Sequence, residues 1–325
     1  MKYCSLRFNN KNCLVGCELS QKCIVCKADA IVYIPYARAA FCREHFIKFY
    51  KRKILNTLKD AGFKGGKVLI GVSGGKDSVA LLHALSSLRD DIKIEVAALY
   101  IDLGIGVYSS KSLEVVRGLE KALENVSFYY FDIKENLGFT IPETTKVLKR
   151  PACAICGSIK RWVLNKFAYE HGFDYVATGH NIDDIATFYL KALLTQRTED
   201  ILRGPEPLTP GVPELRLVGR LRPQFFLSER ENMLYVNLIG LSFIDFPCPL
   251  SRRATLFKYK GLWENILSLN PVAQINFVKT ILDIKKHLTP PKQSNIKLCK
   301  VCGYPTTASD ELCFVCRLRK KLGVL

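Results

Sequence analysis

A short apolar run that ends in a glycine-rich turn constrains this chain more than any other stretch. Residues 67–72 (Lys-Val-Leu-Ile-Gly-Val) have the character of a buried parallel strand, and apolar residues recur at helical spacing over 79–88. The hexapeptide Ser-Gly-Gly-Lys-Asp-Ser at 73–78 joins the two. Such a turn lets backbone N–H groups approach a phosphate closely. The stretch therefore predicts a phosphate-binding turn, although a capped βα turn without a ligand has the same outline.

The residue types in this turn suit a nucleotide with its magnesium ion. The Gly-x4-Gly-Lys-Ser/Thr spacing of a Walker loop is absent, so the turn belongs to another class. Hydroxyl groups can donate to phosphate oxygens, and a carboxylate can hold Mg²⁺. The predicted nucleotide-binding residues of the turn are Ser73, Gly74, Gly75, Asp77 and Ser78.

Strands alternate with helices through the middle of the chain. Further strands are expected at 93–101, 127–133 and 174–178, with a helix at 111–123 among the intervening segments. This order predicts an α/β fold with a doubly wound parallel sheet.

Ligands of such sheets lie beyond the carboxyl ends of the strands. The turn at 73–78 would meet the loops at 104–106 and 179–184 at that edge. The segment 195–223 is rich in Pro, Gly and charge, and is expected to be a long loop.

Charge and cysteine content narrow the class of protein. The 325 residues carry 48 Lys and Arg against 30 Asp and Glu, a net charge of +18, which favours nucleic acid as a partner. Thirteen cysteines without a secretory signal indicate metal ligation in a reducing, cytoplasmic setting. No apolar run approaches the ~20 residues of a membrane span, so no membrane association is expected.

Two sets of four soft ligands have the spacing of structural zinc sites. Each set consists of two pairs, and two pairs can close a tetrahedron around one Zn²⁺. Basic residues flank the second set and are expected to contact phosphates. The expected ligands are Cys23, Cys26, Cys42 and His45 in the first set, and Cys299, Cys302, Cys313 and Cys316 in the second.

Three cysteines in the body of the chain remain. Cys153 and Cys156 precede a helix, and Cys248 lies between two prolines far along the chain. Buried free thiols, a redox or persulfide-carrying pair, and an iron–sulfur cluster held by three thiolates all fit the pattern. Three thiolates would leave one iron with an open position for substrate or sulfide. The spacing alone leaves these readings open.

The hexapeptide at 73–78 resembles the PP-loop of ATP pyrophosphatases, which adenylate a substrate oxygen and release pyrophosphate. Together with the zinc patterns, residues 153–157 (Cys-Ala-Ile-Cys-Gly) and 179–184 (Gly-His-Asn-Ile-Asp-Asp) make the chain similar to the tRNA 2-thiouridine synthetases. Residues 103–109 (Leu-Gly-Ile-Gly-Val-Tyr-Ser) and 302–307 (Cys-Gly-Tyr-Pro-Thr-Thr) are closer to the TtuA branch, which thiolates the T-loop uridine.

The resemblance implies a reaction and the residues that carry it. ATP with Mg²⁺ would adenylate the C2 oxygen of the T-loop (5-methyl)uridine 54 of tRNA, and sulfur would displace AMP by way of a [4Fe–4S] cluster. A ubiquitin-like carrier protein would deliver the sulfur as a thiocarboxylate, and relatives form homodimers. The matching positions are Cys153, Cys156 and Cys248 as cluster ligands, Lys160 and Asp184 as catalytic residues, and Gly179 beside the nucleotide. The chain departs from the family pattern at Ile185, where many relatives carry an acidic residue.

Three alternatives stay open on the sequence: the same chemistry on the anticodon wobble uridine 34, a PP-loop ligase that adenylates a carboxylate, and a non-catalytic zinc-ribbon RNA-binding protein. The chain is expected to have five parts. Residues 1–22, with Cys4, Cys13 and Cys17, form an extension to which the sequence assigns no function. They are followed by an N-terminal zinc finger with a linker helix at 23–62, a PP-loop catalytic domain at 63–225, a helical part at 226–291, and a C-terminal zinc ribbon with a basic tail at 292–325.

Overall fold

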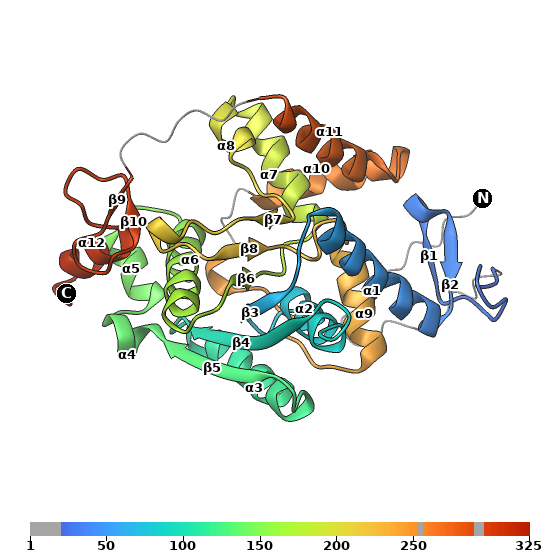
Figure 1. Ribbon diagram of the computed structural model, residues 1–325, viewed down its shortest axis with the longest axis horizontal. Coiled ribbons are helices and arrows are strands. Elements are labelled where there is room, and N and C mark those ends of the chain that lie inside the picture. Colours follow the sequence, from blue (N-terminus) through green and yellow to red (C-terminus); the bar gives the residue numbers. More distant parts are fainter. Residues whose placement is uncertain (1–20, 252–255, 289–295) are drawn as a thin grey trace.

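A six-stranded, mainly parallel sheet forms the centre of the computed structural model, which describes residues 21–251, 256–288 and 296–325 (Figure 1). The sheet has the strand order β5-β4-β3-β6-β8-β7, and only β7 runs antiparallel to its neighbour. Cys4, Cys13 and Cys17 of the expected extension lie outside the described residues. The strands are β3 (Gly66–Val72), β4 (Ile94–Asp102), β5 (Ser127–Asp132), β6 (Tyr175–Ala177), β7 (Leu208–Thr209) and β8 (Gly219–Leu221).

Helices cover both faces of this sheet, which confirms the doubly wound α/β prediction. Side chains of β3 alternate between two cores: Val68 and Ile70 pack with one, and Leu69 packs with the other. The first core contains α1 (Arg43–Asp60), α2 (Lys76–Ser87), α3 (Gly106–Ala122) and α9 (Glu229–Ile239), and the second contains α4 (Ile133–Leu137), α5 (Ile141–Val147), α6 (Ala152–Glu170) and α12 (Phe314–Lys321).

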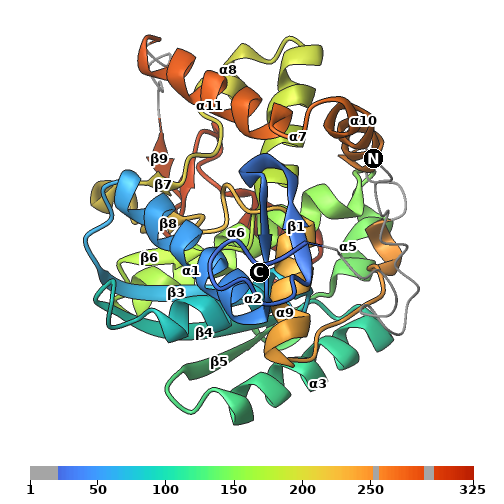
Figure 2. The same ribbon diagram turned by 90° about the vertical axis from the view of Figure 1, so that its right-hand side faces the viewer.

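A third core and two small modules complete the fold. The third core joins α7 (Ile182–Leu194) to α10 (Leu256–Leu269) and α11 (Ala273–Lys286), with α8 (Thr198–Leu202) beside them. Figure 1 shows the hairpin of β1 (Val32–Ile34) and β2 (Ala39–Phe41) at one end of the long axis, and β9 (Lys297–Leu298) with β10 (Pro305–Thr306) at the other. Figure 2 looks along that axis from the end where β1 lies. Among the described residues, none of the helices has the length and apolar character needed to cross a membrane.

The expectation of a long loop at 195–223 is wrong. This segment contains α8, β7 and β8, and β8 pairs in parallel with β6 as a true member of the sheet. Its strands are only two or three residues long, and Gly219-Arg-Leu221 is too short to show an alternating pattern. Tertiary contacts, not local preference, make this segment extend the sheet.

One buried amide accounts for much of that placement. Asn165 of α6 is 3% exposed, donates Nδ2 to the Arg216 carbonyl at 2.8 Å, and accepts from the Val218 N–H at 3.2 Å. We expect Asn165→Ala to lower the free energy of unfolding by about 2 kcal/mol, because it leaves the buried Val218 N–H unpaired and removes the partner of the Arg216 carbonyl. Urea denaturation measures the loss. Asn136→Ala, which removes one exposed hydrogen bond, is the matched control and should change stability by less than about 0.5 kcal/mol. An equal effect of the two substitutions would contradict this account.

Candidate active site

The glycine turn between β3 and α2 leaves the start of the helix open to an anion. Gly75 is the N-cap of α2, and no side chain caps the helix. Gly74 has φ of +77°, a left-handed conformation that favours glycine. Ser78 Oγ donates to the Gly75 carbonyl at 2.9 Å and accepts from Ser73 N at 3.1 Å, so the two serines hold the turn. The exposed N–H groups at such a helix start have the geometry that phosphate binding needs.

Gly179 brings a second loop against this turn. A Cβ at this position would lie 3.0 Å from the carbonyl carbon of Asp77 and 3.2 Å from Ser78 N, so any larger residue would push the loop away. The strands β4 and β6 flank β3 in parallel register, and their carboxyl ends lead into 104–106 and 179–184. The prediction that these loops share one edge of the sheet with the glycine turn is confirmed.

Asp77 is held firmly at this edge. Its Oδ1 accepts from Asn232 Nδ2 at 2.8 Å and from Asn181 Nδ2 at 3.2 Å, while Gln224 Nε2 donates to its backbone carbonyl at 3.1 Å. Burial raises the pKa of Asp77, and Lys76 and Asn232 offset part of that increase. The other oxygen, Oδ2, lies 3.4 Å from Lys76 Nζ, and an ordered carboxylate that still has free lone pairs is a suitable magnesium ligand.

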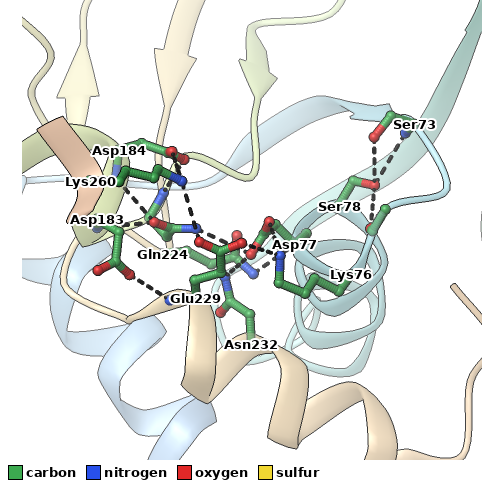
Figure 3. A network of polar contacts seen from close by, with 12 residues as sticks. Ser73, Lys76, Asp77, Ser78, Asp183, Asp184, Gln224, Glu229, Asn232 and Lys260 are labelled. Carbon is green, nitrogen blue, oxygen red and sulfur yellow. Dashed lines mark hydrogen bonds and ion pairs between the residues drawn. The ribbon is translucent and has the colours of Figure 1, made fainter. Parts of the chain in front are cut away.

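A chain of alternating charges runs from the turn to α10 (Figure 3). Lys76 pairs with Glu229 at 2.5 Å, Glu229 with Lys260 at 3.3 Å, and Lys260 with Asp184 at 2.9 Å. Burial would raise the pKa of Glu229, but Lys260 and Lys76 outweigh it and hold that pKa below its usual value. The chain therefore keeps two ammonium groups charged beside the predicted phosphate site.

Asp184 belongs to this chain and also to the start of α7. Asn181 is the N-cap of α7, and Asp184 completes a capping box with it. Its neighbour Asp183 points elsewhere: its carboxylate accepts from Glu229 N at 2.8 Å and from Gln274 Nε2 at 3.0 Å. Of the two acids, Asp184 is the one with a cation for a partner.

The three remaining cysteines come together although Cys248 lies 92 positions after Cys156 in the sequence. Cys153 and Cys156 lie in the first turns of α6, and η3 (Pro249–Ser251), directly after Cys248, packs against that helix. Burial raises the pKa of Cys153 and of Cys156, and the Cys248 thiol raises both further. The packing of η3 on α6, together with these electrostatic effects, indicates that the three thiols lie near one another.

Lys160 and His180 connect the thiols to the nucleotide edge. Lys160 follows Cys156 by one helical turn and lowers the pKa of both Cys153 and Cys156. The pKa of His180 is lowered mainly by desolvation and less by Arg222, Arg161 and Lys160, whereas Asp184 raises it. His180 thus lies within electrostatic reach of both Lys160 and Asp184, and its Nδ1 is 2.7 Å from Thr178 Oγ1.

The donor sets fit the metals that the sequence predicts. In each four-ligand set the donor atoms lie within 4.8 Å of one another, close to the ~3.8 Å that separates sulfurs on one tetrahedral Zn²⁺. Among the described residues, Cys153, Cys156 and Cys248 do not form a set with donor atoms this close, and their three thiols are the ligand type that iron–sulfur clusters take. The two sets are Cys23, Cys26, Cys42 and His45, with a Cys42–His45 contact of 3.2 Å, and Cys299, Cys302, Cys313 and Cys316, with a Cys302–Cys313 contact of 3.5 Å.

The sequence analysis missed several residues of this site. They come from α9, from α10 and from the segment between β8 and α9. No regular sequence spacing relates them to the glycine turn. The sequence signal that could have pointed to them is the capping box of Ser228 and Glu231, which marks the start of α9 and so the helix that carries Glu229 and Asn232. The missed residues are Gln224, Glu229, Asn232 and Lys260.

Comparison with known proteins identifies the family. A PP-loop domain model matches residues 47–245, and a model described as 2-thiouridine synthetase TtuA, N-terminal LIM domain, matches 22–47. The tRNA-5-methyluridine(54) 2-sulfurtransferase of Pyrococcus horikoshii is 36% identical over 93% of this chain and 96% of its own length. Its namesake from Thermotoga maritima is 36% identical over 93% and 97%.

A solved structure agrees with these matches. U34-tRNA thiolase NcsA from Methanococcus maripaludis, with its [4Fe–4S] cluster, has a TM-score of 0.79 and 26% identity, over 94% of this chain and 98% of that one. The fold, the two cysteine modules and the sequence similarity extend over almost the whole chain. The chain therefore belongs to the PP-loop tRNA 2-thiouridine synthetases, the superfamily that includes TtuA.

Proposed function

We propose that this protein is an ATP-dependent tRNA-uridine 2-sulfurtransferase that acts on the T-loop 5-methyluridine 54. The observation that carries the proposal is near-full-length similarity to two tRNA-5-methyluridine(54) 2-sulfurtransferases, joined to an N-terminal module of the TtuA type. The substrate is tRNA, and the reaction consumes ATP and releases AMP and pyrophosphate.

The first half of the reaction uses the glycine turn. The open start of α2 would bind the phosphates of ATP, and Asp77 would hold Mg²⁺. The C2 oxygen of the uridine attacks the α-phosphorus, the bond to the β-phosphate breaks, and pyrophosphate leaves. Lys76 and Lys260, kept protonated by Glu229, stabilise the negative charge on the phosphates. AMP on the oxygen turns it into a good leaving group.

The second half of the reaction uses the thiols. Cys153, Cys156 and Cys248 would hold a [4Fe–4S] cluster, which supplies an iron with an open position for sulfide. Lys160, one turn from Cys156, would offset charge on the AMP as it departs from C2. Asp184 would position the nucleotide through its ion pair with Lys260. The proposed sulfur source is the thiocarboxylate of a ubiquitin-like carrier protein.

Further features of the proposal concern the assembly. One Zn²⁺ in each four-ligand set would fix the module around it, because all four positions are filled by protein. Thiolate ligands to zinc and iron require a reducing compartment, so a cytoplasmic location is proposed. A homodimer is proposed from the family resemblance alone.

One anaerobic assay tests the function. Purified protein is reconstituted with iron and sulfide, then given ATP, sulfide and unmodified tRNA, and the nucleosides are mapped by mass spectrometry. We expect 2-thio-5-methyluridine at position 54 when the tRNA carries the methyl group, and no product without ATP. Absence of any 2-thiouridine and of tRNA-stimulated pyrophosphate release would overturn the proposal in favour of a non-catalytic RNA-binding protein.

The second candidate is thiolation of the wobble uridine 34. It is favoured by the structural match to a U34-tRNA thiolase. The same mass-spectrometric map separates the two, because product at position 34 and none at 54 would assign the chain to the wobble reaction.

A further inference from the structure

We propose that a basic cleft next to the three thiols holds the phosphate backbone of the tRNA beside the uridine that is modified. The cleft has a volume of about 1290 Å³ and lies between α6, the segment 199–222 and the C-terminal module. The inference rests on the proposed tRNA-thiolating function and adds the surface that grips the RNA.

Positive charge in the cleft exceeds what its own carboxylates can neutralise. Each of the two acidic side chains in the lining already has a basic partner: Glu199 lies 3.6 Å from Arg203, and Glu206 lies 2.6 Å from Lys285. In the part of the chain that the structure describes, no ion pair with a carboxylate involves the following three lining residues, which we call the arginine cluster: Arg161, Arg220 and Arg222.

The members of the arginine cluster lie close enough to repel one another. Burial and then the charge of Arg220 together lower the pKa of Arg222 to about 10. Arg161 is affected in the same order, by burial and then by Arg220. Arg222 is oriented by hydrogen bonds to the Glu206 carbonyl at 2.6 Å and to Thr209 Oγ1 at 3.2 Å. Glu206 offsets part of the repulsion on Arg222, and the repulsion that remains among the three arginines is relieved when an anion binds between them.

The arginine cluster borders the catalytic residues. Arg161 directly follows Lys160 on α6, and the charge of Lys160 lowers the pKa of the Cys156 thiol. Arg161 and Arg222 both lower the pKa of His180, which belongs to the loop at 179–184 beside the glycine turn. An RNA strand in the cleft would therefore have its neighbouring base within reach of the site where C2 must be adenylated and thiolated.

The chemistry of the lining favours RNA over the tail of a carrier protein. A guanidinium fork matches the oxygens of a phosphate and can bind it with two parallel hydrogen bonds. A polynucleotide offers one such anion for each residue, so three arginines can each be satisfied. A protein tail that ends in a thiocarboxylate offers a single anion for the same three cations.

Binding of unmodified tRNA at a series of salt concentrations tests this inference. We expect Arg161→Gln and Arg220→Gln each to weaken binding by about tenfold at 0.1 M salt and to lower the slope of log K against log[salt] by about one. The double variant should lose about a hundredfold. ATP affinity and zinc content should not change, because neither arginine contacts the glycine turn or a zinc ligand set in the hydrogen bonds and ion pairs of the described residues.

Arg117→Gln is the matched control, because Arg117 is an exposed arginine of α3 on the opposite face of the sheet, and this variant should bind tRNA as the wild type does. Unchanged affinity and salt slope in the double variant would overturn the inference. So would normal tRNA binding combined with a raised KM for a thiocarboxylated carrier protein. Binding of tRNA does not require thiolation. A protein that binds tRNA through the arginine cluster but forms no 2-thiouridine would therefore refute the proposed function and leave the inference about the cleft intact.

Discussion

Replacing Cys248 by alanine is expected to reduce formation of 2-thiouridine at least about a thousandfold while leaving the fold intact. Two bonds hold the turn at this residue, from Ser251 N at 3.0 Å and from Ser251 Oγ at 2.7 Å, and both end on the Cys248 carbonyl. Alanine keeps that carbonyl and removes only the thiol. Two thiolates would remain for the cluster, and its iron content should fall with the activity.

The measurements are 2-thiouridine by mass spectrometry, iron and zinc content, and tRNA affinity, all under anaerobic conditions. Zinc and tRNA affinity should match the wild type, because the ligands of both zinc sets and the arginine cluster are untouched. Cys17→Ala, at a cysteine with no assigned ligand role, is the control and should retain iron and activity. Thiolation at the wild-type rate by Cys248→Ala would refute the three-thiolate site.

The glycine turn could be predicted because its determinants are local. The strand before it and the helix after it are both recognisable from their patterns of apolar residues. A phosphate-binding turn also needs no contact with a distant part of the chain. The strands predicted at 93–101, 127–133 and 174–178 are β4, β5 and β6 within a residue at each end. Each is bounded by glycine or charge. The strands β4 and β6 are largely buried and apolar, whereas β5 is a half-exposed strand at the edge of the sheet that aromatic residues mark.

The parts that escaped prediction depend on contacts between distant residues. β8 becomes a strand because β6 offers it a free edge and Asn165 fixes the chain before it. Glu229 and Lys260 join the active site only after α9 and α10 have packed beside α2 and α7. No regular sequence spacing predicts that these residues will lie beside the glycine turn. Resemblance to a family supplied the role of Cys248, and the structure then brought it to Cys153 and Cys156.

Asp77→Asn should lower ATP-driven pyrophosphate release by about 10²–10³-fold without loss of stability. Asparagine is isosteric and its Oδ1 can still accept from Asn181 and Asn232, but it has no charge for Mg²⁺. The long ion pair with Lys76 at 3.4 Å is also lost, which costs little because Lys76 keeps Glu229 as a partner. The pKa of Asp77 is raised, so the folded protein binds more protons than the unfolded chain between the two pKa values. The stability that the protonated form contributes is therefore lost as pH rises through the folded-state pKa, and a permanently neutral side chain avoids that loss.

Chemical denaturation at pH 7.5 should accordingly give Asp77→Asn a free energy of unfolding equal to or above that of the wild type, while pyrophosphate release falls. The matched control is Asp132→Asn at the carboxyl end of β5, where asparagine caps α4 as well as aspartate does. That variant should keep both stability and activity, because the strand lies two positions from β3. A large drop in the stability of Asp77→Asn would show that its carboxylate serves the fold, and full activity would show that the nucleotide's metal is held elsewhere. Loss of turnover without loss of stability is the result expected if the Asp77 carboxylate serves to bind the metal ion, because burial disfavours its charged form and the fold does not need it.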